Sequence, residues 1–110
     1  MTIEEQKQLF TDLTEKAKET LAKKGHDYAN SDVLSNFKLA AELAGNTGKR
    51  NCLSLIATKV VRLSNLFDKQ EDESFVIENE SIEDSILDLF NYSFLLYCLE
   101  QESKGLLIKQ

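Results

Sequence analysis

Residues 80–100, ESIEDSILDLFNYSFLLYCLE, are the most informative stretch of the chain, because they read as one long helix with apolar side chains on most of its circumference. A helix that is hydrophobic nearly all round is buried between neighbouring elements. One line of it is nevertheless polar, since Asp84, Asp88 and Asn91 stand at positions i, i+4 and i+7 and project from one side. Carboxylates are rarely buried without a partner. The sequence therefore predicts a cation or a metal ion beside these acids.

Three more helices are expected from apolar residues that recur every three or four positions, over residues 3–24, 33–44 and 51–68. The chain contains no proline, which suits long helices with short connections. Residues 69–80 break the helical period and carry many acids, so they read as a loop. The whole chain, residues 1–110, is expected to form one all-α domain, a bundle of four helices.

Several residues mark where these helices should begin and end. Thr2 and Glu5 form a T-x-x-E capping box, which opens the first helix. Gly25 and Gly45 stand where C-terminal glycines of the first and second helices would lie. Ser31 or Asp32 can cap the second helix, and NTGKR at 46–50 reads as a turn. Ser81 opens an S-x-x-D pattern and is the expected N-cap of the last helix.

Composition excludes several classes of function. The net charge is −6, and binding to a nucleic-acid backbone needs a basic surface, so nucleic acid is not expected as a partner. No apolar run is long enough for a membrane span, and the first residues do not resemble a signal peptide. Cys52 and Cys98 stand far apart and read as free thiols. These features favour a cytoplasmic protein that binds no membrane.

Two carboxylates on the last helix are candidate metal ligands. Asp84 and Asp88 lie one turn apart and can share Mg²⁺, which prefers oxygen ligands and is held by few protein carboxylates. The competing interpretation is that Asp84 only caps its helix and Asp88 pairs with a cation. Spacing alone leaves both interpretations open.

The helix over 51–68 carries the complementary charges. Lys59 and Arg62 are neighbours on one face and can hold phosphate oxygens, with Asn65 one turn further on. The competing interpretation is a salt bridge from Lys59 or Arg62 to Asp84 or Asp88. We expect Asp88 to point toward this helix in either case.

A polar segment around residues 26–37 is a candidate site for a nucleotide base, because aromatic and amide groups there can stack on a base and bind its edge. The competing interpretation is an ordinary loop between helices. No nucleophile triad, P-loop or dinucleotide fingerprint is present. Together with polar residues of the two long C-terminal helices, the nucleotide-binding candidates are Asp27, Tyr28, Asn36, Asn65, Asn91 and Tyr92.

Three blocks carry a family resemblance: KKGHDYANSDVLSNF at 23–37, KVVRLSNL at 59–66 and ESIEDSILDLFNY at 80–92. They resemble the motif set of the nucleotide modification associated domain family, type 1, which is found in phages and bacteria. That family is placed near the MazG-like all-α nucleoside triphosphate pyrophosphohydrolases. The resemblance covers about residues 20–100 and implies a helical, oligomeric protein whose site lies between the last two helices, with the host cytoplasm as its location if a phage encodes it.

The MazG-like resemblance implies particular site residues. Those enzymes hold Mg²⁺ with E-x-x-E on one helix and E-x-x-D on the next. Asp88 matches the aspartate of the second motif, whereas its glutamate position falls on Ser85, with Asp84 one place away. Lys59 and Arg62 stand where the first motif has glutamates.

Two functions are therefore expected from the sequence. The first is a nucleotide-binding protein that resembles a Mg²⁺-dependent pyrophosphohydrolase and acts on an ordinary or modified nucleotide. The second is a binding module for a nucleotide or a protein, a phage accessory or inhibitor protein that has lost the metal site. The expected partners are a nucleotide or another small phosphate ligand and further copies of the chain, in a homodimer or a larger homo-oligomer.

Overall fold

The computed structural model describes residues 1–26, 33–72 and 79–105. Within these ranges the chain forms four α-helices and no strand: α1 (Ile3–His26), α2 (Ser35–Leu43), α3 (Gly48–Glu71) and α4 (Asn79–Ser103). The prediction of an all-α fold is confirmed. None of the described helices combines the length and hydropathy that a membrane span requires.

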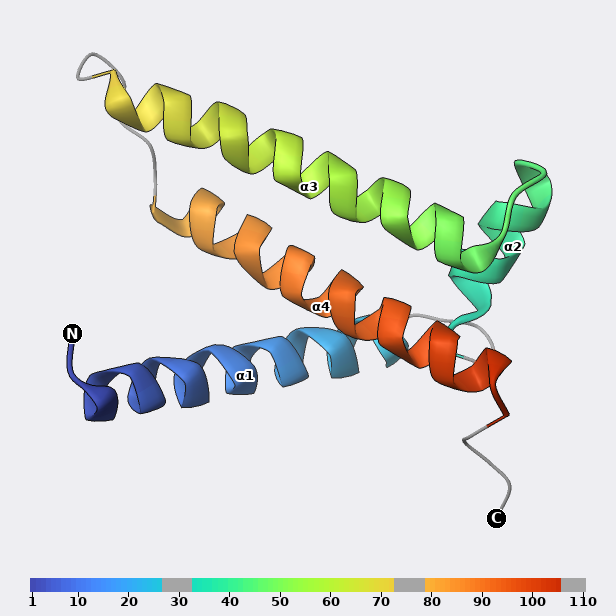
Figure 1. Ribbon diagram of the computed structural model, residues 1–110, viewed down its shortest axis with the longest axis horizontal. Helices are drawn as coiled ribbons and strands as arrows, with labels where there is room; N and C mark the ends of the chain where they lie inside the picture. Colours follow the sequence, from blue (N-terminus) through green and yellow to red (C-terminus); the bar gives the residue numbers. More distant parts are fainter. Residues whose placement is uncertain (27–32, 73–78, 106–110) are drawn as a thin grey trace.

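Helix α4 is the centre of the arrangement (Figure 1). It runs antiparallel to α3, which packs along one side of it, and α1 packs against another side. Helix α2 packs on α3 near the end of the molecule where α4 finishes. An ion pair between Lys16 Nζ of α1 and Glu83 Oε1 of α4, 2.9 Å long, joins the middle of α1 to the beginning of α4. The helices thus form an open arrangement around α4.

The hydrophobic core lies where α2, α3 and α4 meet. Its buried members are Leu34, Phe37, Cys52 and Leu99. The Cys52 thiol, which is completely buried, donates a hydrogen bond of 3.2 Å to the Tyr92 carbonyl oxygen. Burying a large apolar side chain stabilises the fold by about 1.5–3 kcal/mol, so this cluster holds α3 and α4 together.

Two of the expected helix boundaries are confirmed. The Glu5 amide donates to Thr2 Oγ1 at 3.1 Å, and the Thr2 amide donates to Glu5 Oε2 at 3.4 Å, which is the reciprocal capping box. At the end of α2, Gly45 has φ +67°, and its amide donates to the Glu42 carbonyl. The Asn46 amide reaches back to the Ala41 carbonyl at 2.7 Å, which completes a Schellman motif.

Other boundaries differ from the prediction. Helix α1 continues through Gly25, and Ser81 lies inside α4 rather than before it. Helix α3 begins at Gly48, inside the turn that was expected at 46–50. Thr47 is its N-cap, since Thr47 Oγ1 accepts a hydrogen bond of 3.2 Å from the Arg50 amide. The helix therefore begins about one turn earlier than its apolar residues predicted. Leu34 precedes α2 without a side-chain cap. Ser31 and Asp32 lie outside the described residues.

The expected burial of α4 on nearly all sides is wrong for the single chain. Phe94 and Tyr97 are 47% and 60% exposed, and Ile86 and Phe90 are also partly exposed. The physical reason is the open arrangement, since α3 and α1 cover only two sides of α4. One apolar face of the central helix is left in contact with solvent.

Candidate functional site

Asp88 lies at the junction of three helices, where it meets two lysines. Its Oδ2 is 2.8 Å from Lys59 Nζ of α3, and its Oδ1 is 3.5 Å from Lys24 Nζ of α1. The side chains of Asp88 and Lys59 are only 23% and 22% exposed. The predicted orientation of Asp88 toward α3 is confirmed, and the carboxylate forms the ion pair that was the competing interpretation.

Sequence reasoning missed Lys24, although a signal for it exists. Ala17 and Leu21 belong to the apolar stripe of α1, and Lys24 follows them at i+7 and i+3. The same stripe therefore continues into a cation at the end of the helix. That the cation meets Asp88, rather than solvent, depends on how α1 crosses α4.

Opposing effects set the pKa of Asp88. Partial burial raises the pKa, because it disfavours the charged form, but the hydrogen bond from Lys59 and the charges of Lys24 and Lys59 together outweigh burial. The pKa of Asp88 is therefore held below its ordinary value. Asp88 remains a carboxylate at neutral pH and cannot serve there as a proton donor.

Arg62 meets Ser85 instead of an acid. Arg62 Nε donates to Ser85 Oγ at 3.0 Å, and Ser85 Oγ donates to the Ser81 carbonyl at 2.9 Å. Ser85 is 2% exposed, whereas Asp84, one of the two acids considered as partners of Lys59 or Arg62, is exposed. The partner of Arg62 is a neutral hydroxyl, so the charge of the guanidinium is not cancelled by this contact.

The predicted Mg²⁺ site, with Asp84 and Asp88 as its ligands, stays a prediction. Both oxygens of Asp88 face lysines, and Asp84 is exposed on the helix. Within the described part of the chain, no group of three or more acidic, histidine or cysteine side chains is placed to hold a metal ion. The position of the motif's glutamate is held by Ser85, which is engaged by Arg62.

A basic groove runs along the exposed side of α3. It has a volume of about 520 Å³, and its polar lining comprises Thr58, Lys59, Arg62, Asn65 and Lys69. We call it the α3 groove. The structure thus brings together the predicted residues Lys59, Arg62 and Asn65, and it adds Lys69, which follows them at helical spacing. Lys59 takes part both in this groove and in the ion pair with Asp88.

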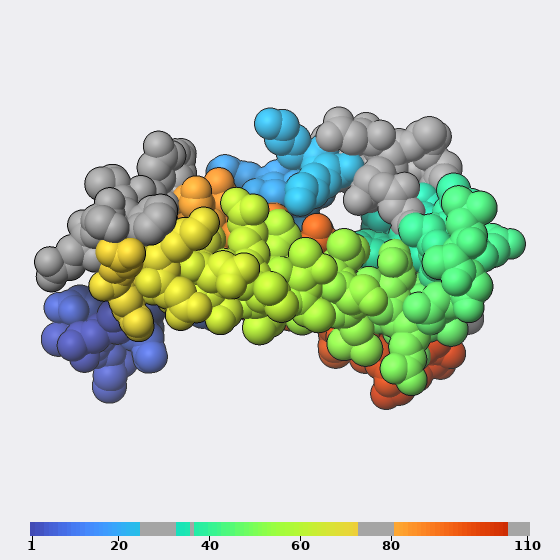
Figure 2. Space-filling model, turned by 90° about the horizontal axis from the view of Figure 1, so that it is seen from above, coloured from blue at the N-terminus to red at the C-terminus, as the bar shows by residue number. Residues whose placement is uncertain are grey.

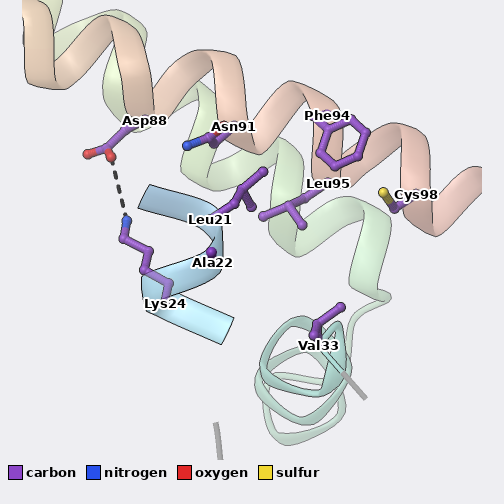
Figure 3. Close-up of a pocket in the computed structure, with 9 residues that line it drawn as sticks. All are labelled: Leu21, Ala22, Lys24, Val33, Asp88, Asn91, Phe94, Leu95 and Cys98. Atoms are coloured by element: carbon purple, nitrogen blue, oxygen red, sulfur yellow. Dashed lines mark ion pairs between the residues drawn. The ribbon is translucent and has the colours of Figure 1, made fainter. Parts of the chain in front are cut away.

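Asn91 lies deeper than the charged residues. It is 6% exposed, and its Nδ2 donates to the Ala17 carbonyl of α1 at 3.3 Å. Its Oδ1 is buried and has no hydrogen-bond partner in the described structure. Asn91 and Asp88 line a cavity of about 290 Å³ between α1, α4 and the residues before α2. Figure 3 shows this cavity, with the Lys24–Asp88 ion pair at one end.

Tyr92 lies in a second groove on a different side of α4. The Lys24 ammonium lies 6.0 Å from the centre of its ring, and the Phe37 ring meets it edge-on at 6.4 Å. Lys24, Phe37, Asn51 and Tyr92 contribute to the lining of this groove of about 520 Å³. Figure 2 shows a gap in the surface between α2, α3 and the end of α1. Lys24 borders both this groove and the Asn91 cavity.

Three of the predicted nucleotide-binding residues cannot be placed. Asp27 and Tyr28 lie outside the described residues, and so does the side chain of Asn36. Of the others, Asn65 lines the α3 groove, Asn91 lines the cavity and Tyr92 lines the second groove.

Comparisons of the chain with protein-family models, with curated proteins and with solved structures find no match.

Proposed function

We propose that the protein binds a small nucleotide and that the α3 groove holds the phosphates. The observation that carries this proposal is the concentration of Lys59, Arg62 and Lys69 in one groove of a chain whose net charge is −6. Arg can bind phosphate through two parallel hydrogen bonds, and Lys binds it as a point charge. Thr58 and Asn65 add neutral donors at the same place.

The contacts of two of these cations, Arg62 and Lys59, support an anionic ligand. Arg62 is positioned by the neutral Ser85 hydroxyl and keeps its charge available. Lys59 is paired with Asp88 and half-buried, so an incoming phosphate would compete with that carboxylate. The Ser85 contact also fixes the direction of the guanidinium, which lowers the entropy lost when a ligand binds.

We propose a binding module rather than a Mg²⁺-dependent hydrolase. Hydrolysis of a triphosphate in a MazG-like manner needs carboxylates that hold Mg²⁺, and the acid that best matches that role, Asp88, faces two lysines. Arg62 and Lys59 would offset part of the charge of such a ligand without a metal ion. We place this function in the cytoplasm, where the two free thiols, Cys52 and Cys98, are stable.

The test is a calorimetric titration with inorganic tripolyphosphate, which carries the phosphate chemistry without a base. We expect Arg62→Ala to weaken binding about tenfold or more, because a hydrogen bond to a charged group contributes about 1.5–3 kcal/mol. Lys7→Ala is the matched control, since it removes one positive charge from an exposed position of α1. Equal affinities for wild type, Arg62→Ala and Lys7→Ala would refute phosphate binding in the α3 groove.

A second measurement separates binding from turnover. A nucleoside triphosphate is incubated with the protein and Mg²⁺, and the products are separated by chromatography. We expect the nucleotide to be recovered intact. Release of pyrophosphate that disappears in Asp88→Asn would instead establish the hydrolase.

We also propose that the protein is a homodimer. Its accessible surface is 8204 Å², whereas a compact monomer of 12.5 kDa exposes about 6,200 Å². Its radius of gyration is 16.6 Å, compared with about 13 Å for a compact domain of this length. A row of apolar side chains on the open face of α4 is available for a second copy: Ile86, Phe90, Phe94 and Tyr97.

A further inference from the structure

The starting observation is a row of exposed apolar side chains on α3. Leu53, Val60 and Phe67 are all exposed and follow one another at intervals of seven residues. Seven residues make almost two turns of an α-helix, so the three side chains lie on one face. Lys59 points toward α4, and Val60 and Thr58 are each turned from it by about 100°, in opposite directions. Because Thr58 lines the α3 groove, the row lies on the other side of α3.

This row is complementary to a copy of itself turned end for end. Val60 stands midway between Leu53 and Phe67. A second α3 laid antiparallel on the first, with a twofold axis at Val60, therefore brings Leu53 of each copy against Phe67 of the other. The same axis brings the two Val60 side chains together at the centre.

The charges around the row also suit a second copy. The only charged residues between 51 and 67 are Lys59 and Arg62, and both point away from the row, toward α4. Arg50 precedes the row and Glu71 follows it, and both are exposed. Neither forms an ion pair with another described residue. In the antiparallel arrangement, Arg50 of each copy comes within about one turn of Glu71 of the other.

A groove beside Phe67 extends this surface onto α4. It has a volume of about 510 Å³, and residues of three helices line it, among them Leu13, Phe67, Ile82 and Ile86. Figure 1 shows that the first half of α1, which forms one wall, diverges here from α4. The exposed apolar rows of α3 and α4 therefore meet in this groove.

The register of α3 and α4 places Phe90 of a second copy at the groove. Because Lys59 meets Asp88 and the two helices are antiparallel, a twofold axis perpendicular to them at Val60 crosses α4 close to Ile86. Phe90 is partly exposed and lies one turn beyond that point. In the other copy, the equivalent position is one turn before that point, where the groove lies.

We infer that the dimer forms with α3 antiparallel to α3 of the second copy about a twofold axis at Val60, and that Phe90 of each copy fills the groove between α1, α3 and α4 of the other. This inference rests on the proposed homodimer and names its interface. The surface of one chain exceeds that of a compact monomer by more than the about 800 Å² that each partner buries in a standard interface. The α3 groove stays outside the interface and remains open to a ligand.

Cross-linking of Val60→Cys in the full chain tests the position of the axis. The two introduced thiols face each other, within the Cα separation of about 4.4–6.8 Å that a disulfide spans. We expect mild oxidation to convert most of this variant to a covalent dimer on a non-reducing gel. Ser54→Cys is the matched control, because Ser54 is also exposed on α3 but its two copies would be about 18 Å apart along the helices. Wild type reports any cross-linking through Cys52 and Cys98.

An exchange of charges tests the two ends of the interface. Arg50→Glu and Glu71→Arg each place like charges opposite one another, and we expect each to raise the dissociation constant of the dimer about threefold or more. The double variant restores both pairs with exchanged signs and should recover the dissociation constant of wild type. Within one chain the two residues are about 30 Å apart along α3, so recovery requires contact between copies. Glu71→Arg also lowers the net negative charge, so general repulsion predicts the opposite effect for it.

The outcomes separate this interface from the other proposals. Cross-linking by Val60→Cys but not by Ser54→Cys, with recovery in the double variant, supports the inference. A wild-type mass of two chains, with Val60→Cys cross-linking no faster than Ser54→Cys, overturns the interface and leaves the homodimer standing. Absence of recovery in the double variant overturns the antiparallel register. A wild-type mass of one chain overturns both the interface and the homodimer, whereas tripolyphosphate binding that depends on Arg62 would still support the nucleotide proposal.

Discussion

The substitution Asp88→Asn tests whether Asp88 pairs with lysines or binds a metal ion, because the two roles predict opposite effects on ligand binding. The substitution leaves Lys59 and Lys24 without their counter-charge, and we expect the free energy of unfolding to fall by about 1–3 kcal/mol. Both lysines lose the group that competes with a ligand, so tripolyphosphate should bind more tightly. Melting curves and calorimetry provide the two measurements.

Asp84→Asn is the matched control for this substitution. Asp84 is exposed on the same helix, so its replacement should change the free energy of unfolding by less than about 0.5 kcal/mol. If Asp84 and Asp88 instead held Mg²⁺ together, both substitutions would abolish Mg²⁺-dependent ligand binding. That result would contradict the cation-pairing role.

The lowered pKa of Asp88 predicts how stability depends on pH. A carboxyl whose pKa is lower in the folded state than in the unfolded chain stabilises the fold above its unfolded pKa, which is about 3.9 for Asp. This contribution is lost as the pH falls through the folded pKa. We expect the difference in melting temperature between wild type and Asp88→Asn to be constant from pH 7 to about pH 5 and to shrink below pH 4. A difference that stays constant to pH 3 would exclude this linkage.

At the scale of the helices, two glycines provide a test of the chain path between α2 and α3. Gly45 has φ +67°, which a residue with a Cβ adopts only with strain, so Gly45→Ala should destabilise the protein by about 1 kcal/mol although nothing lies within 4 Å of the added carbon. Gly48 lies in the first turn of α3, and an added Cβ would meet Leu99 Cδ2 at 3.4 Å, an ordinary contact. Gly48→Ala should therefore be neutral or stabilising by up to about 1 kcal/mol.

Urea denaturation of the two variants measures both effects. The two variants carry the same Gly→Ala change three residues apart, so the effect of this change on the unfolded chain cancels when their free energies of unfolding are compared. Equal destabilisation by Gly45→Ala and Gly48→Ala would contradict the Schellman end of α2.

At the scale of the whole molecule, the exposed face of α4 predicts self-association. Light scattering at micromolar concentration should give a mass near twice the 12.5 kDa of one chain. Phe90→Glu places a charge in the middle of the apolar row on α4 and should return the mass to that of a monomer. Leu43→Glu is the control, because Leu43 is equally apolar and highly exposed but belongs to α2. A wild-type mass near 12.5 kDa would exclude the dimer.

Much of the local structure was determined by the sequence alone. Periodic apolar residues predicted four helices, and the capping box at Thr2 and Glu5 and the glycine at Gly45 predicted two of their ends. These features depend on hydrogen bonds between residues a few positions apart, which is why a short stretch of sequence suffices. The orientation of Asp88 toward α3 also followed from its own helix, which offers no wide polar face.

The site itself was decided by the tertiary structure. Spacing of four residues leaves Asp84 and Asp88 about 40° apart around the helix, and only the crossing of α1 and α3 over α4 decides that one is enclosed by two lysines while the other is exposed. Contacts between distant elements also place Arg62 on Ser85 and leave Asn91 Oδ1 buried without a hydrogen-bond partner among the described residues. Such contacts depend on how each helix is rotated about its axis, and packing against distant neighbours sets that rotation, so no single stretch of sequence contains it.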